Sequence, residues 1–176
     1  MPLQLFALSG SLRAHSYNSA TLRALQALAP ASVRIAIGSI AGLPLFNPDR
    51  ESEIIAEVDA LKRSIAACDG LIIASPEYAH GVSGPMKNAL DWLVSGTEIP
   101  HKPIMLINTS PRAHHAQDAL RETLITMSGG IIDAASVSIP LLSSGADTAA
   151  IIAAPALSAP LLAGLAFFCE AIDALR

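Results

Sequence analysis

Aromatic and charged residues are both scarce in this sequence of 176 residues, and their scarcity excludes several kinds of partner. Aromatic residues make up 4% of the chain, so the stacking platforms that bind single-stranded nucleic acid are not expected. Charged residues make up only 15%, and 15 acidic residues against 11 basic ones give a net charge of −4. This balance argues against nucleic acid or an anionic membrane surface as a partner.

Cysteine is nearly absent as well. Cys68 and Cys169 each lie in an apolar helical stretch with no basic neighbour, so we expect inert buried thiols rather than a disulfide framework. Among the histidines, His114 and His115 are adjacent and would face different directions on a helix. The other three show no paired ligand spacing, so no metal site is expected.

Several motifs are missing from the chain. It contains neither G-x-x-x-x-G-K-[ST] nor G-x-G-x-x-G, and it has no G-x-S-x-G elbow, which disfavours P-loop, dinucleotide-fold and serine-hydrolase sites. The N-terminus lacks the basic and long apolar regions of a signal peptide, so we expect a cytoplasmic protein. Residues 148–169 carry no charge, but Pro155, Pro160 and Gly164 interrupt them, and we expect a soluble segment there.

The hydrophobic pattern alternates between strands and helices along the whole chain. Strands are expected at residues 3–8, 33–37, 71–74, 104–107 and 131–139. Helices are expected after Asn18, over 51–67 with Glu51 and Glu53 in the first turn, from Pro85, around 120–127 up to Gly129-Gly130, and over 161–175. This order predicts one α/β domain spanning residues 1–176, a doubly wound five-stranded parallel sheet with helices on both faces.

Three polar loops follow the first, third and fourth of these strands. If the strand order is 2-1-3-4-5, the loops 9–18, 75–84 and 108–112 meet at the carboxyl edge of the sheet. Ligands of such sheets bind at that edge, so the three loops would form one site.

The first loop contains three serines, an arginine and an asparagine before a helix start, which favours a phosphate cradle. The alternative is an ordinary turn in which Ser16 or Asn18 caps the helix and Arg13 is solvated. Judged on this loop alone, both interpretations stay open.

The second loop is more specific. Pro76 fixes the backbone, while Gly81 and Gly84 would permit turns closed to other residues. The N–H groups of Glu77, Tyr78 and Ala79 would then face a planar heterocycle. The alternative is a helix-entry loop in which Tyr78 packs against a neighbour.

Together these motifs resemble a known family. The sequence Gly10-Ser11-Leu12-Arg13 with Ser16 and Asn18, the sequence Pro76-Glu77-Tyr78, and residues 84–92 (GPMKNALDW) are similar to the NAD(P)H-dependent FMN reductases of flavodoxin-like fold. That group includes quinone, chromate and azo-dye reductases. The resemblance implies that the FMN phosphate is held by Ser11, Arg13, Ser16, Tyr17 and Asn18. It also implies that Pro76, Glu77, Tyr78 and Ala79 lie along the isoalloxazine ring, and that Ser110 closes its other side.

The chain departs from the family pattern at two places. Many relatives carry Asn where this chain has Ala79, and residues 109–112 lack the glycines often seen there. Arg112 could face the phosphates of NADPH or be a solvated surface residue. In this family the helix containing Lys87 and Trp92 serves mainly in packing and subunit contact.

Two functional hypotheses follow. In the first, NADPH or NADH passes hydride to bound FMN, which reduces a quinone, azo compound, free flavin or similar small acceptor. The cofactor carries this chemistry, so no side chain is assigned as catalytic. The alternative is a flavodoxin-like electron carrier without its own nicotinamide site. The apolar composition and the uncharged residues 148–169 favour a homodimer or homotetramer.

Overall fold

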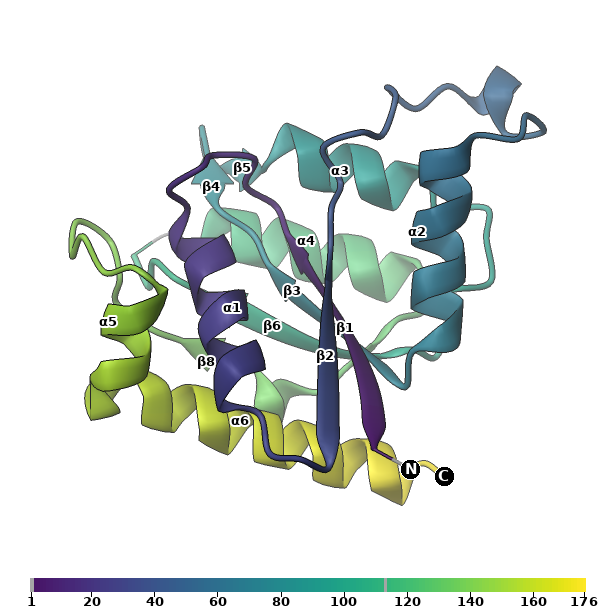
Figure 1. Cartoon of the computed structure of the whole chain (residues 1–176). Coiled ribbons are helices and arrows are strands. Elements are labelled where there is room, and N and C mark those ends of the chain that lie inside the picture. The colour runs from purple at the N-terminus through teal and green to yellow at the C-terminus, as the bar shows by residue number, and fades with distance from the viewer. Residues whose placement is uncertain (1, 113) are drawn as a thin grey trace.

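The centre of the computed structural model, which describes residues 2–112 and 114–176, is a parallel sheet (Figure 1). Its strands lie in the order β2-β1-β3-β6-β7, and β8 pairs with β6 beyond β7. With β7 and β8 sharing the fifth place, this is the predicted order 2-1-3-4-5 in a flavodoxin-like α/β fold. The strands of this sheet are β1 (Leu3–Ser9), β2 (Val33–Gly38), β3 (Gly70–Ala74), β6 (Pro103–Asn108), β7 (Gly130–Ile131) and β8 (Val137–Ser138).

Helices cover both faces of the sheet. They are α1 (Tyr17–Leu28), α2 (Ala56–Ala67), α3 (Gly84–Asp91), α4 (His115–Thr126), α5 (Thr148–Ala153) and α6 (Pro155–Ala174). On one face, α1, α5 and α6 pack against alternate strand residues such as Leu5 and Ile72. On the other face, α2, α3 and α4 pack against the residues between them, such as Phe6 and Ile73. Successive side chains of a strand point to opposite faces of the sheet, so one apolar strand contributes to the hydrophobic clusters on both faces.

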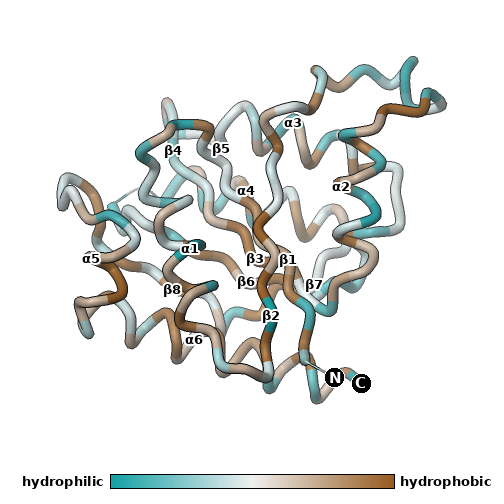
Figure 2. Tube along the Cα trace, in the orientation of Figure 1, coloured by the Kyte–Doolittle hydropathy of each residue, from teal (hydrophilic) through white to brown (hydrophobic). Residues whose placement is uncertain are grey.

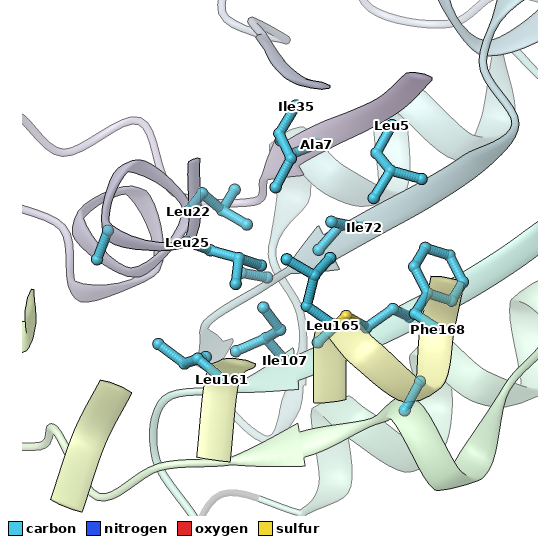
Figure 3. Packing of buried hydrophobic residues seen from close by; sticks show 14 of the residues in the cluster. Leu5, Ala7, Leu22, Leu25, Ile35, Ile72, Ile107, Leu161, Leu165 and Phe168 are labelled. Atoms are coloured by element: carbon cyan, nitrogen blue, oxygen red, sulfur yellow. The ribbon is translucent and has the colours of Figure 1, made fainter. Parts of the chain in front are cut away.

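Figure 2 shows hydrophobic residues concentrated on the central strands, as their sequence predicted. All five residues of β3 are buried. Figure 3 shows Leu22 and Leu25 of α1 and Leu161, Leu165 and Phe168 of α6 directed toward Ile72 and Ile107 of the sheet. These contacts fix α1, and therefore the loop that precedes it, against the carboxyl edge of β1 and β3.

The predicted last strand is wrong in form. Instead of one strand over 131–139, the chain forms β7, a 3-10 turn at Asp133–Ala135, and β8. The amide of Leu106 on β6 then bonds the hydroxyl of Ser136 at 3.3 Å instead of a strand backbone. The loose alternation of residues 131–139 was read as a continuous strand because a short turn leaves the apolar pattern almost unchanged.

The start of α2 is also later than predicted. The helix begins at Ala56, so Glu57 and Asp59, not Glu51 and Glu53, are the acidic residues of its first turn. Residues 48–50 form a 3-10 helix, and Ile54 is 92% exposed rather than packed. Because Ile54 and Ile55 continue the helical spacing, the sequence predicts a helix that starts before Ala56, where the helix in the structure begins.

Helix α6 is long and apolar enough to cross a membrane by length and composition, with a mean hydropathy of 1.6. It begins at Pro155, earlier than predicted, and contains Pro160. Its inner residues Leu161, Leu165 and Phe168 are nevertheless part of the core beside the sheet (Figure 3). One face of α6 therefore packs in the hydrophobic core of the domain.

Candidate functional site

The first loop ends in a capped helix. Ser16 is the N-cap of α1, and its hydroxyl accepts a hydrogen bond from the Ser19 N–H at 3.3 Å. The capping alternative is therefore correct for Ser16 and wrong for Asn18, whose side-chain oxygen accepts from the Thr109 hydroxyl at 3.2 Å. An accepting hydroxyl keeps its own hydrogen, so Ser16 can still donate to an anion.

The loop also contains donors that the protein does not consume. The buried hydroxyl of Ser11 accepts from the Arg13 N–H at 3.4 Å and retains its hydrogen. The Asn18 oxygen takes the Thr109 bond, which leaves the amide nitrogen as a donor. Arg13 is exposed and forms no ion pair with any residue that the structure describes. Together with the start of α1, where only the Ser19 amide of the first three is capped, this is a donor set suited to phosphate.

The second loop is a hairpin, which the sequence did not predict. Strands β4 (Glu77–Tyr78) and β5 (Gly81–Val82) pair antiparallel through a two-residue turn. The turn residues Ala79 and His80 have φ of 50° and 59°, as a type I′ turn requires. Gly81 and Gly84 were predicted to form the turn, and this is wrong, because the residues with positive φ are Ala79 and His80.

Contacts with α4 support this unusual turn. The Glu77 carboxylate accepts from the Ala116 N–H in the first turn of α4 at 2.9 Å. The His80 ring stacks on the His115 ring with centroids 4.4 Å apart and planes 12° apart, and His114 packs beside His115 at 4.1 Å. His80 is thus not isolated from the histidine pair as the sequence suggested. Tyr78 is 49% exposed, so about half of its surface is covered by the protein.

Two buried side chains tie the three loops together. The Ser83 hydroxyl caps α3 and donates to the Gly10 carbonyl at 2.6 Å, joining the second loop to the first. The Thr109 bond to Asn18 joins the third loop to the first. Sequence reasoning missed both residues, because a Ser before Gly-Pro and a Thr after a strand look like local caps.

Close approach of the first two loops depends on Gly10. A Cβ at this position would lie 2.9 Å from the Cβ of Ser75 and 3.0 Å from the Ser83 hydroxyl oxygen. Both serines are buried. A glycine here lets the two backbones meet at the carboxyl edge of the sheet.

A cavity of about 170 Å³ opens between the three loops. It is lined by nine of the ten predicted residues, all except Ala79. Its lining consists of Ser11, Arg13, His15, Ser16, Tyr17, Asn18, Pro76, Glu77, Tyr78, Thr109, Ser110 and Leu142. His15, Thr109 and Leu142 were not predicted, and no sequence signal marks Leu142, which comes from the loop after β8.

The loop after β8 is tethered to the site. The Gly145 N–H donates to the Tyr17 hydroxyl at 3.0 Å, which leaves the phenolic hydrogen free to donate. Leu142 of this loop lines the cavity together with residues of the first and third loops. Tyr17 therefore has a structural contact in addition to its place in the cavity lining.

The two cysteines lie away from this cavity. Burial raises the pKa of the Cys68 thiol despite the nearby charge of Lys102, whose ammonium donates to the Cys68 carbonyl at 2.6 Å. The prediction that Cys68 has no basic neighbour is therefore wrong, although desolvation dominates. Burial also raises the pKa of Cys169. Both thiols stay protonated near neutral pH and are poor nucleophiles.

The sequence and the fold both match known proteins. A family model described as NADPH-dependent FMN reductase matches residues 3–145. A quinone reductase of Escherichia coli is 42% identical over 115 residues, which cover 61% of this chain and 60% of that protein's length. An NAD(P)H-dependent FMN reductase of Pseudomonas aeruginosa is 36% identical over 129 residues, 70% of each chain. The solved structure of a flavoenzyme NAD(P)H:(acceptor) oxidoreductase from Paracoccus denitrificans superposes with a TM-score of 0.79 at 25% identity, covering 97% of both chains.

Proposed function

Because the chain belongs to the NADPH-dependent FMN reductase family, we propose that it is an FMN-dependent oxidoreductase. NADPH or NADH is the electron donor, and a quinone, azo compound, free flavin or similar small molecule is the acceptor. The observation that carries this proposal is the meeting of three loops around one cavity, with phosphate donors at one end and a hairpin at the other.

At the phosphate end, Arg13 supplies the positive charge. The hydroxyls of Ser11, Ser16 and Tyr17 and the amide of Asn18 supply neutral donors, each with a hydrogen left after its protein contact. Charge-assisted hydrogen bonds of this kind are the strongest available to a phosphate in a water-accessible loop.

At the proposed ring end, Pro76, Glu77, Tyr78 and Ser110 all line the cavity, which supports a ring held between the hairpin and the third loop. The Ser110 N–H bonds the Asn108 side chain at 2.8 Å, so the third loop is held by its own turn. Ala79 lies at the tip of the hairpin, outside the cavity lining, and its proposed contact is with the ring edge through backbone only. The Glu77 side chain faces α4, so its contribution to the ring is also from backbone.

When bound there, FMN supplies the transfer of hydride from the nicotinamide and the delivery of two electrons to the acceptor. The residues of this chain bind the phosphate, orient the ring between the hairpin and the third loop, and exclude water from one face of it. No side-chain acid or base is assigned.

Anaerobic titration of the FMN-loaded protein with NADPH and with NADH tests this function. We expect loss of the oxidised flavin absorbance on addition of a nicotinamide, and steady NADPH consumption when a quinone is present. A flavin that stays oxidised with both donors would contradict the proposal and favour the electron-carrier alternative.

We also propose that the protein is a homodimer or homotetramer in the cytoplasm. Support comes from apolar residues on the outer surface of α6, where Phe167 is 52% exposed and Leu162 is 36% exposed. Sedimentation velocity would measure the assembly, and Phe167→Glu should shift it toward the monomer. A monomer in the unmodified protein would contradict this proposal.

A further inference from the structure

A second cavity adjoins the proposed flavin site. It has a volume of about 500 Å³ and lies between the first turns of α1 and the segment 142–148. The two cavities share five lining residues, which are Arg13, His15, Ser16, Tyr17 and Leu142. A ligand in the second cavity would therefore lie directly beside the phosphate end of a flavin in the first.

The wall of this cavity is basic. Arg23, in the second turn of α1, lines this cavity but not the flavin site, and Arg13 lines both. Within residues 2–112 and 114–176, neither arginine forms an ion pair. The one acidic lining residue, Asp147, uses its carboxylate to cap α5 through the Ala150 N–H at 2.9 Å. An unpaired arginine beside a roomy cavity suits a phosphate group.

The number of arginines around the two cavities indicates which phosphate group the second cavity would bind. FMN has a single phosphate, and Arg13 in the first loop is placed to bind it. Arg23 is a second cation, outside the flavin site, and is available to bind a second anion. NADPH and NADH differ only in the 2′-phosphate of NADPH, so a free arginine beside the flavin site would separate the two donors.

Another cavity lies on the far side of Leu142. It has a volume of about 410 Å³ and contains Arg112 as its only cation. It joins the flavin site through Ser110 and Leu142. It offers a single arginine, whereas the α1 cavity is lined by both Arg13 and Arg23.

We infer that the α1 cavity binds the 2′-phosphoadenosine end of NADPH, that Arg23 contacts the 2′-phosphate, and that the enzyme prefers NADPH to NADH. This inference rests on the proposed function, since it assigns the donor of the same reaction. Arg23, on which the inference depends, lies outside the loop motifs of the family resemblance.

Calorimetric titration of the FMN-loaded protein with 2′,5′-ADP and with 5′-AMP tests the site without catalysis. The two probes differ only in the 2′-phosphate, and we expect 2′,5′-ADP to bind about tenfold more tightly or better. Arg23→Gln should remove the difference, and the matched variant Arg112→Gln should keep it. Equal binding of both probes to the unmodified protein, or loss of the difference in Arg112→Gln but not Arg23→Gln, would overturn the inference.

Steady-state kinetics give a second readout. The ratio of kcat/KM for NADPH to that for NADH should fall about tenfold in Arg23→Gln. An unchanged ratio in this variant would also overturn the inference. Arg23 is exposed on α1, and a thermal unfolding curve and the flavin content would show whether the variant folds and binds FMN. If the unmodified protein retains FMN and accepts both donors equally, only this inference fails; if no donor reduces the flavin, the proposed function fails.

Discussion

The two loops that flank the proposed flavin site are built by different means. The first loop, residues 9–18, has no residue with positive φ, and its proposed binding groups are side chains whose types are visible in the sequence. The hairpin of β4 and β5 places Ala79 and His80 at positive φ and is supported by α4, a distant segment. The first loop depends on its own side chains, whereas the conformation of the hairpin depends on contacts with α4. The two loops should therefore respond differently to mutation.

The largest expected effect is in the first loop. Arg13→Gln should weaken FMN binding about tenfold to a hundredfold, because a charge-assisted hydrogen bond to phosphate contributes about 1.5–3 kcal/mol. Riboflavin, which lacks the phosphate, should bind about as before. Flavin fluorescence titration measures both affinities, and Arg63→Gln on the remote helix α2 is the control. Equal weakening of FMN and riboflavin would remove Arg13 from its assigned role.

Substitution of Gly10 tests whether the two loops must touch. Gly10→Ala should lower the free energy of unfolding by about 1–3 kcal/mol, because its Cβ overlaps the buried Ser75. Gly84→Ala is the matched control, since a Cβ there meets nothing within 4 Å. Urea unfolding of both variants measures the difference. If Gly10→Ala proves as stable as Gly84→Ala, the close approach of the loops is not required.

The support from α4 can be removed at Glu77. Glu77→Ala should cost about 1 kcal/mol of unfolding free energy by leaving the Ala116 N–H without its acceptor, and FMN should bind more weakly. Glu77→Gln retains an acceptor oxygen and should stay close to the unmodified protein. Chemical unfolding and FMN titration report the two effects. A loss as large in Glu77→Gln would mean that charge, not the bond to α4, matters here.

The smallest effect concerns the strained turn. Ala79→Asn should raise the unfolding free energy by about 0.5 kcal/mol, because asparagine tolerates the left-handed region better than alanine. The same change at Ala27, an exposed position in α1, should lower it by a similar amount through helix propensity. Thermal unfolding compares the two. Stabilisation at both positions, or at neither, would argue against backbone strain at Ala79.

The sequence predicted most of the fold because its apolar runs are short, regular and bounded by turn residues. The order and pairing of β1, β2, β3 and β6 and the two helical layers are as expected. The start of α2 and the form of the last strand were not, since apolar spacing continues past the hydrogen-bonded elements. Apolar periodicity reports burial, and it marks element ends poorly.

For the site, sequence reasoning found the loops but not how they are held. Turn conformations closed to other residues were expected at Gly81 and Gly84, but positive φ falls on Ala79 and His80 instead. The bonds of Ser83 to Gly10 and of Glu77 to Ala116 join residues far apart in the chain. Such long-range contacts have no local signature, which is why Ser83 and the bond of Glu77 to α4 were missed while nine of the twelve lining residues were predicted.

The interrupted end of the sheet has a consequence for solubility. An exposed strand offers unpaired amides and carbonyls on which a strand of another molecule can add. Here that outer position is divided into β7 and β8, each two residues long, with a 3-10 turn between them. Neither piece offers a long enough template for intermolecular strand addition, so this edge is protected from fibrous self-association.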